Sequence, residues 1–490
     1  MYIGGIDIGS TGAKIAIYDK ELNLKDTFYE SYPVLHTAGY AEIDLNIVFK
    51  KIINLLEKTC EKYELSSIAI TSFGETFAML DEFDQIIAPS MLYTDTRGKE
   101  QVSYLIEKLG KENIALKVGV TPHEMYSLPK MMWIKEKFPE EFTKVKKILL
   151  VQDYIVYMLT GIAQIDYSLA ERSLAFNINT KEYDDDILTV SGIDKSLLSK
   201  PVAMGTLAGT IKEELCRKHN LNLNIKVVNG CHDQIANMFG SGVFNSNIAM
   251  DGAGTLECYC AILNEPPKFE FYENGYCCVP YLDKYATYAF SYGGCNCIKE
   301  FKEKYAKAEA EYCKVNNIDF YEYMEAQSQG LVKDLFILPY FSGAGTPYMD
   351  NEARGSIINL GFEHSLGDLY ESLLESIVFE LKVNVSLLEE YGVKPQVLMA
   401  SGGGANSKHW LQLKANILNK KIIVLPIKEI GCAGTALIVG LSENLFDSIE
   451  EGFNKMSQGS KMICPVKFDK EKYDEKFEKY KKIYKLLKGI

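Results

Sequence analysis

A chain of 490 residues is too long for one hydrophobic core, so we expect at least two domains. Its composition, 47% apolar and 24% charged, is that of a soluble globular protein, and no apolar run reaches the ~18 residues that span a bilayer. The net charge of −13, with acidic and basic residues interleaved, excludes the basic surface of a nucleic-acid-binding protein. The first residues lack the basic and apolar segments of a signal peptide, so we expect a cytoplasmic location.

Residues 2–19 predict two β-strands joined by a tight turn of glycine, serine and threonine. The backbone N–H groups of this turn and the hydroxyls of Ser10 and Thr11 suit phosphate oxygens, whose charge Lys14 would offset. Asp7 precedes the turn, and a carboxylate there would repel phosphate unless Mg²⁺ lies between them. The alternative is an ordinary hairpin, because the chain contains neither the P-loop pattern nor the dinucleotide-binding fingerprint.

Strand-like and helical segments then alternate along the chain, which predicts an α/β fold. Residues 67–73 and 226–231 are strand-like, and residues 46–60 have helical periodicity. Residues 247–263 repeat the hairpin pattern of the N-terminus. This repetition indicates a distant internal duplication, with a boundary near residues 242–246.

In the second half, residues 366–390 predict a long amphipathic helix. Besides the first turn, three glycine-rich turns follow β-like runs; they span residues 251–255, 291–296 and 400–407. Close backbone approach without a Cβ suits a nucleotide, above all where a helix begins at 407 after the last turn. Each turn alone is open to a plain structural reading, but four in one chain favour nucleotide binding.

The C-terminal residues 469–490 are locally basic, and their apolar side chains recur at helical spacing. These side chains are Tyr473, Phe477, Tyr480 and Tyr484. The pattern predicts an amphipathic helix docked on the protein, with a solvated lysine face.

Twelve cysteines in a long cytosolic chain are expected to be reduced thiols. Six of them lie close together in the sequence: Cys258, Cys260, Cys277, Cys278, Cys295 and Cys297. Each C-x-C pair is predicted to point its sulfurs to one face of a strand, and turn residues typical of a zinc site are missing between the first two. We therefore expect buried small side chains, with a cysteine-ligated metal or redox protein as the alternative.

Cys231, His232 and Asp233 stand side by side in front of an apolar run. This trio is compatible with a metal site, with a thiol nucleophile and its base, or with a carboxylate that takes a proton. The three residues alone do not decide between these chemistries.

Five segments resemble the FGGY carbohydrate kinases in order and spacing: GIDIGSTGAK (5–14), YTDTRG (93–98), GCHDQIANMFGSG (230–242), LPYFSGAGTPYMDNEARG (338–355) and SGGGANSKHWLQLKANIL (401–418). The resemblance implies an ATP- and Mg²⁺-dependent kinase of a sugar or polyol. It also implies two actin-like (ribonuclease H-like) ATPase domains with a nucleotide and substrate cleft between them. We expect residues 1–242 to carry the sugar site, the phosphate hairpin and the catalytic carboxylate. Residues 243–490 would carry the adenosine site and the C-terminal amphipathic helix.

By this resemblance Asp233 is the general base, a task that contributes roughly 10² to 10⁴ in rate. Asp7 would join it around Mg²⁺. The remaining nucleotide positions implied are Ser10, Thr11, Gly12 and Thr255 at the phosphates, and Gly294, Gly403, Gly404 and Ser407 at the adenosine. His232 either orients a substrate hydroxyl or packs beside the catalytic strand, and Gln234 falls in the same substrate-binding stretch.

Residues 71–81 occupy the sugar-reading segment of the family, where Glu75 and Thr76 match glycerol kinases but Gly74 replaces their arginine. We expect Gly74 to leave room for a four- to six-carbon ketose or polyol, with glycerol kinase as the alternative. Glu75 as a plain surface carboxylate is the structural alternative. Asp95 and Arg97 are either close to the substrate or a structural ion pair.

The strongest rival class is an actin-like ATPase without a sugar substrate, which would share the phosphate hairpins but leave the stretch around Asp233 without a task. We expect a small-molecule sugar or polyol as the partner, with neither nucleic acid nor membrane. A homodimer is the quaternary state that we consider.

Overall fold

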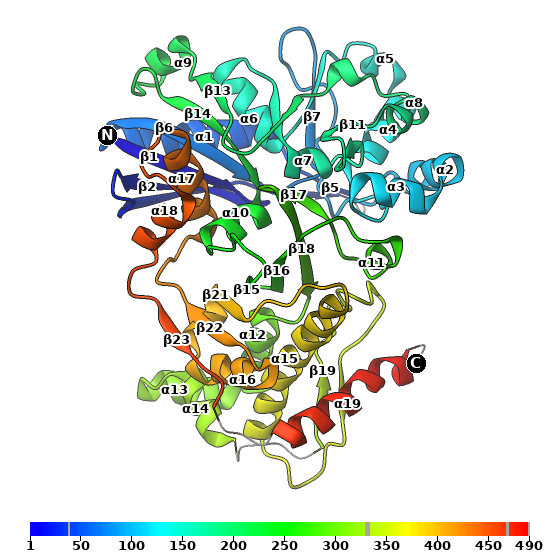
Figure 1. Cartoon of the computed structure of the whole chain (residues 1–490), viewed down its shortest axis with the longest axis vertical. Helices are drawn as coiled ribbons and strands as arrows, with labels where there is room; N and C mark the ends of the chain where they lie inside the picture. Colours follow the sequence, from blue (N-terminus) through cyan, green and yellow to red (C-terminus); the bar gives the residue numbers. More distant parts are fainter. Residues whose placement is uncertain (38–39, 329–333, 467–469, 489–490) are drawn as a thin grey trace.

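The computed structural model describes residues 1–37, 40–328, 334–466 and 470–488. The described residues form two lobes, each built on a β-sheet with flanking helices, which lie one above the other along the long axis of the molecule (Figure 1). The predicted α/β class is therefore confirmed. None of the helices in these described ranges combines the length and apolar character that crossing a membrane requires.

The first lobe contains a six-stranded sheet of order β13-β14-β6-β1-β2-β3. Its strands are β1 (Tyr2–Ile8), β2 (Gly12–Asp19), β3 (Leu24–Ser31), β6 (Leu65–Ser72), β13 (Leu207–Thr210) and β14 (Lys226–His232). The hairpin β1–β2 is antiparallel, as predicted, whereas β1, β6 and β14 run parallel to one another. Small two-stranded sheets pair β4 (Leu35–Thr37) with β5 (Tyr40–Glu42), β7 (Phe77–Leu80) with β8 (Lys147–Leu150), β9 (Gln164–Asp166) with β12 (Lys200–Val202), and β10 (Phe176–Asn177) with β11 (Glu182–Tyr183).

The second lobe repeats this topology in a sheet of order β17-β18-β16-β15-β21-β22-β23. Its strands are β15 (Ile248–Ala253), β16 (Glu257–Leu263), β17 (Val279–Tyr281), β18 (Lys284–Ser291), β21 (Val397–Ser401), β22 (Lys421–Val424) and β23 (Lys461–Ile463), and β19 (Phe336–Leu338) pairs separately with β20 (Ser356–Ile358). An antiparallel hairpin again joins a parallel pair, because β15 pairs with β16 and runs parallel to β21 and, through it, to β22. This shared order agrees with the duplication indicated by the two hairpin sequences.

Parallel strands end at the same edge of a sheet, and this topology determines which loops meet. The carboxyl ends of β1, β6 and β14 bring three segments to one edge: the turn at 9–11, the turn at 73–76, and Asp233. In the second lobe, β15 and β21 likewise bring the turn at 254–256 beside the glycines at 402–404. The predicted phosphate, sugar and adenosine segments all lie on these two edges.

The helices flank the two sheets. Those of the first half are α1 (Leu45–Cys60), α2 (Lys99–Leu109), α3 (Lys111–Val118), α4 (Ser127–Lys137), α5 (Pro139–Phe142), α6 (Val151–Thr160), α7 (Tyr167–Glu171), α8 (Asp185–Ser191), α9 (Glu213–Lys218) and α10 (Asp233–Gly240). Those of the second half are α11 (Phe269–Glu273), α12 (Cys295–Lys304), α13 (Lys307–Asn316), α14 (Phe320–Gln327), α15 (Leu366–Glu390), α16 (Lys408–Leu418), α17 (Ile430–Ser442), α18 (Ile449–Met456) and α19 (Lys470–Leu487). In α19 the four predicted apolar side chains are buried, as expected of a docked amphipathic helix.

One helix departs from the expected division of the chain at residue 242. Helix α17 leaves the second lobe and packs against α10 and β1 of the first, with α18 beside it (Figure 1). Glycines permit this contact, because a Cβ at Gly5 would lie 2.1 Å from the carbonyl oxygen of Cys432, and one at Gly240 would lie 2.2 Å from that of Ile430. The first lobe is thus completed by residues that the linear division assigned to the second.

The C-x-C pairs differ from each other. Cys258 and Cys260 lie on β16 with their sulfurs 3.7 Å apart on one face, as predicted. Cys295 and Cys297 instead lie in the first turn of α12, so the strand predicted there is wrong. The glycines at 293 and 294 end β18 early, and a helix begins directly after them. All twelve cysteines are free thiols.

Candidate active site

Asp233 begins α10 directly after β14, at the edge where the first sheet ends. Its side chain is 29% exposed, and the Nε2 atom of His232 lies 3.3 Å from its Oδ1 atom. Burial raises the pKa of Asp233 to about 8, and the negative charges of Asp7 and Glu75 act in the same direction. The carboxylates of Asp7 and Glu75 therefore lie near that of Asp233, and negative charge is concentrated at this site.

Asp7 lies on β1 opposite Lys14 of β2. Burial raises the pKa of Asp7 to about 6, whereas the charge of Lys14 opposes this shift. The Lys14 amine is 2.8 Å from Oε2 of Glu429, the residue before α17, so it is already in an ion pair. The start of α17 also lies close to Asp7, because a Cβ at Gly431 would lie 2.7 Å from Oδ2 of Asp7. Neither Glu429 nor Gly431 was a sequence candidate.

The turn after β1 carries the predicted phosphate ligands Ser10 and Thr11. It is closed by a hydrogen bond of 2.9 Å from the Gly9 N–H to the Gly12 carbonyl. Tyr32 donates its hydroxyl to the Gly9 carbonyl at 2.5 Å. A Cβ at Gly12 would lie 2.3 Å from the hydroxyl of Tyr29, so the ring of Tyr29 lies directly over the backbone of this glycine. Two tyrosines therefore pack against the turn: Tyr29 on β3, and Tyr32 directly after this strand.

The second lobe brings its predicted nucleotide residues together around the turn from β15 to β16. A Cβ at Gly294 would lie 2.8 Å from the Thr255 carbonyl oxygen, and one at Gly404 would lie 2.5 Å from the Cβ of Ala253. Gly403 lies in the same 402–404 turn. Ser407 caps α16 by accepting the Trp410 N–H at 3.0 Å and donates its hydroxyl to Glu325 at 2.8 Å.

A buried ion triad that the sequence did not reveal lies under this turn. The amine of Lys414 on α16 is 2.8 Å from Oδ2 of Asp251, and it also contacts Oε1 of Glu257. All three side chains are buried, and the two carboxylates flank the hairpin turn on β15 and β16. The triad fastens the hairpin to α16 and fixes the position of Thr255.

Glu75 lies at the centre of a strained turn. Its φ is +68°, and the Thr76 N–H donates to the Gly74 carbonyl at 2.8 Å, which is a γ-turn. The Glu75 side chain is only 5% exposed, so the surface-carboxylate alternative is wrong. Burial raises the pKa of Glu75, and the charges of Arg172 and Lys130 oppose this shift.

The space beside Gly74 is not open, contrary to our expectation. A Cβ at Gly74 would lie 2.5 Å from the Cγ of Arg172, because the side chain of Arg172 crosses this position. Its Nη1 atom lies 3.5 Å from Oε1 of Glu75. The side chain of Arg172 therefore fills the space beside Gly74, which leaves no room there for extra substrate carbons.

Asp95 and Arg97 bind each other. Nη2 of Arg97 lies 2.6 Å from Oδ2 of Asp95 and 2.6 Å from Oε1 of Glu42, and the Ala41 N–H donates to Asp95 at 2.9 Å. Arg97 also lies over the ring of Tyr40, 4.3 Å from its centroid. These contacts hold β5 against the 93–98 segment and favour the structural alternative for the pair.

Tyr93 in the same segment points to the carboxylates, although sequence reasoning missed it. Burial raises the pKa of Tyr93, and the charges of Glu75 and Asp233 add to this shift, while a hydrogen bond with Ser10 opposes it. Tyr93 therefore lies among the predicted phosphate, sugar and base residues. Tyr93 is 39% exposed, which leaves it accessible to solvent.

His232 and Gln234 connect Asp233 to the second lobe. The His232 ring is stacked on Tyr288 of β18 with centroids 6.2 Å apart, and burial lowers the pKa of His232 well below its ordinary value. The imidazole is therefore neutral. Gln234 accepts the thiol of Cys258 on β16 at 3.3 Å. Both neighbours of the candidate base thus contact the second sheet.

Two family models match most of the chain. Residues 2–240 match the N-terminal domain, and residues 287–442 the C-terminal domain, of the FGGY family of carbohydrate kinases. The chain belongs to this family. As a carbohydrate kinase, it has the two-domain actin-like, ribonuclease H-like fold expected from the resemblance, and the rival of an actin-like ATPase without a sugar substrate is wrong.

Similar proteins include kinases of several substrates. The xylulose kinase of Bacillus subtilis (strain 168) is 25% identical over 500 residues, covering 100% of this chain and 98% of that protein. The glycerol kinase of Thermococcus onnurineus (strain NA1) is 26% identical over 504 residues, with coverage of 100% and 98%. The crystal structure of gluconate kinase from Lactobacillus acidophilus superposes with a TM-score of 0.90 at 23% identity, covering 99% of this chain and 98% of that one.

Mg²⁺, the metal ion that the family resemblance implies, takes oxygen ligands. The described residues contain no cluster of three or more histidine, cysteine or acidic side chains suited to holding one. Asp7 and Asp233 nevertheless fit Mg²⁺, because this ion is typically bound by one or two carboxylates together with phosphate oxygens and water. Burial is the largest cause of the raised pKa of both groups, and a bound cation would offset the negative charge of the two ionised carboxylates.

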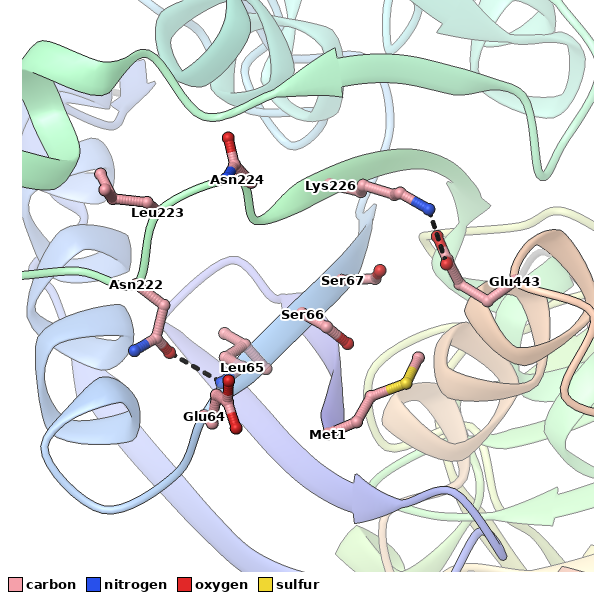
Figure 2. Close-up of a pocket in the computed structure, with 10 residues that line it drawn as sticks. All are labelled: Met1, Glu64, Leu65, Ser66, Ser67, Asn222, Leu223, Asn224, Lys226 and Glu443. Atoms are coloured by element: carbon pink, nitrogen blue, oxygen red, sulfur yellow. Dashed lines mark hydrogen bonds and ion pairs between the residues drawn. The ribbon is translucent and has the colours of Figure 1, made fainter.

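A cavity of about 660 Å³ lies elsewhere in the kinase (Figure 2). It opens where β6 and β14 begin, between the loop at 222–224 and Glu443, which forms an ion pair of 2.8 Å with Lys226. The candidate base follows the opposite end of β14. This cavity is therefore separate from the candidate active site.

Proposed function

We propose that this kinase phosphorylates a hydroxyl of a four- to six-carbon ketose or polyol, with Asp233 as the general base. The observation that carries the proposal is the convergence of Asp233, Glu75 and Tyr93 at one edge of the first sheet, beside the turn of Ser10. A carboxylate suits the task, because it takes the hydroxyl proton as the oxygen attacks the phosphoryl group.

The side chains around Asp233 would hold it in position for this transfer. Neutral His232 would donate its Nε2–H to Asp233 and leave the second carboxylate oxygen facing the substrate hydroxyl. Buried Glu75 would accept hydrogen bonds from other hydroxyls of the substrate and so orient it. Gln234 would bind the substrate from the same helix turn as Asp233.

ATP and Mg²⁺ would be bound by residues of both lobes. The turn of Ser10, Thr11 and Gly12 would hold the β- and γ-phosphates with Thr255 opposite, and Gly294, Gly403, Gly404 and Ser407 would line the adenosine site. Lys14 would offset phosphate charge by turning its amine from Glu429 towards the phosphates. Asp7 and Asp233 would hold Mg²⁺, which supplies charge neutralisation on the phosphate oxygens.

The substrate range rests on the relatives and on Glu75. Relatives named xylulose, glycerol and gluconate kinases act on short chains with adjacent hydroxyls, the groups that a buried carboxylate acceptor would recognise. A coupled ATP-consumption screen over ketoses, polyols and aldonates tests this range. Turnover confined to glycerol would favour the alternative, for which Glu75 and Thr76 are the supporting residues.

The variant Asp233→Asn tests the base itself. We expect phosphoryl transfer to fall by roughly 10² or more, while the melting temperature and sugar binding stay close to the wild type, because only the proton acceptor is lost. Asp185→Asn, a change at a carboxylate that is 85% exposed, is the control. Near-normal turnover of Asp233→Asn would contradict the assignment.

A further inference from the structure

Gly74 and Arg172 come from distant parts of the chain and occupy one place. Gly74 follows β6, whereas Arg172 follows α7, and the arginine side chain passes over the glycine where a Cβ would lie 2.5 Å from Cγ and 2.9 Å from Cδ. Any side chain at residue 74 would collide with it. Glycine at 74 is therefore a requirement of arginine at 172.

Arg172 is held on all sides. Its Nε atom donates to Glu171 at 2.5 Å, and its Nη1 atom lies 3.5 Å from Glu75. Its guanidinium lies between the rings of Tyr126 and Tyr288, 5.3 Å and 5.7 Å from their centroids. With a side chain that is 4% exposed, Arg172 is locked in one orientation.

We propose that Arg172 is a positioning residue that fixes the Glu75 carboxylate for recognition of substrate hydroxyls, and so determines which acceptors this kinase prefers. The inference rests on the proposed function of Glu75. Glycerol kinases carry an arginine at the position of Gly74 in their sequence pattern. We assign the positive charge of that arginine to Arg172, which comes from a different segment of the chain.

The strained turn explains why such a clamp is needed. Glu75 is buried in a γ-turn, so its backbone is held away from relaxed conformations while burial favours the neutral carboxyl. A neutral carboxyl loses an acceptor site for substrate hydroxyls. The adjacent guanidinium keeps the carboxylate charged and aimed, and the ring of Tyr288 brings the second lobe into the same arrangement.

The kinetic test compares two substrates. Arg172→Gln keeps the side chain as far as Cδ but removes the guanidinium and its charge, and Arg172→Lys keeps a positive charge without the planar guanidinium. For the best acceptor found in the screen, we expect KM to rise about tenfold or more in Arg172→Gln, with little change in kcat. The ratio of kcat/KM for this acceptor to kcat/KM for its deoxy analogue should fall, by about a hundredfold at most. Arg172→Lys should recover part of the preference, and Arg217→Gln, at an arginine that is 74% exposed, should change neither value. Equal losses for both substrates would overturn the proposal, because a purely structural role does not distinguish them.

A double-mutant cycle, measured by melting temperature, tests this packing without any substrate. Gly74→Ala should lower the melting temperature by several degrees in the wild-type background and by much less in an Arg172→Ala background, since the collisions with Cγ and Cδ are then absent and only the Cβ of residue 172, at 3.0 Å, remains. Additive shifts would overturn the placement of Arg172. If no acceptor in the screen were phosphorylated, the proposed function would fail, and this cycle would still decide whether Arg172 fixes the turn.

Discussion

At the scale of single residues, the sequence predicted groups that lie in short motifs and missed groups that meet through the fold. Asp7, Ser10 and Asp233 belong to local patterns whose chemistry is recognisable without a structure. Arg172 has no such pattern, because 97 residues separate it from Glu75. The wrong expectation about Gly74 has the same origin, since an absent side chain indicates space only when nothing else enters it.

Asp7 offers the sharpest test of the metal assignment. In Asp7→Asn we expect the Mg²⁺ concentration that gives half-maximal activity to rise about tenfold or more, because one of two proposed carboxylate ligands loses its charge. Titrating Mg²⁺ at fixed ATP and measuring sugar affinity by calorimetry separate the two sites. A change in sugar affinity with an unaltered Mg²⁺ dependence would assign Asp7 to the sugar site instead.

At the scale of elements, apolar periodicity predicted the long helices well. The predicted helix at 366–390 matches α15, whose start is set by a capping box between Ser365 and Asp368. What no local signal revealed is how α15 and α19 are joined. Glu380 in the middle of α15 accepts the hydroxyls of Tyr480 at 2.6 Å and Tyr340 at 2.8 Å, so a buried carboxyl connects the C-terminal helix to the core.

This contact predicts a pH dependence of stability. Burial raises the pKa of Glu380 to about 7, opposed by the two hydroxyls, so between roughly pH 4.5 and 7 the folded state binds a proton that the unfolded state has released. Stability contributed by this group is present below about pH 4.5 and is lost as the pH rises through about 7, by at most about 3 kcal/mol. Glu380→Gln should remove this decline, which melting curves of both proteins at pH 5 and pH 7.5 measure. Parallel declines in both would show that Glu380 is ionised throughout.

At the scale of the whole molecule, the two lobes contact each other beside the sugar segments as well as through the connecting chain. The Cys278 N–H donates to the Gly119 carbonyl at 2.8 Å, and Thr121 donates to the Tyr272 carbonyl at 2.7 Å. A Cβ at Gly119 would lie 2.2 Å from the Cys278 carbonyl oxygen. The spacing of the lobes on this side is therefore set by the lack of a side chain.

Two glycines with the same backbone conformation allow this spacing to be tested. Gly119 follows α3 with φ +80° and ψ +10°, and Gly161 follows α6 with φ +82° and ψ +4°, but the nearest neighbour of a Cβ at Gly161 would be the Cε atom of Lys212, at 3.4 Å. Both Gly→Ala variants should lose about 1 kcal/mol or more from strain. Only Gly119→Ala should also separate the lobes and raise the sugar KM, by roughly tenfold. Identical kinetics for the two variants would show that this contact does not set the geometry of the cleft.

The return of α17 to the first lobe has a consequence for how the protein is made. During synthesis, β1 and α10 leave the ribosome long before residues 430–442, so the glycine surfaces of both stay uncovered until nearly nine-tenths of the chain has been translated. The two proposed metal ligands sit on these same elements, Asp7 at the end of β1 and Asp233 at the start of α10. A nascent or truncated chain that ends before α17 lacks the helix that packs against these two elements, so the edge of its first lobe that carries Asp7 and Asp233 is without this cover. The proposed acidic pair therefore acquires its full surroundings only in a chain that extends through residue 442.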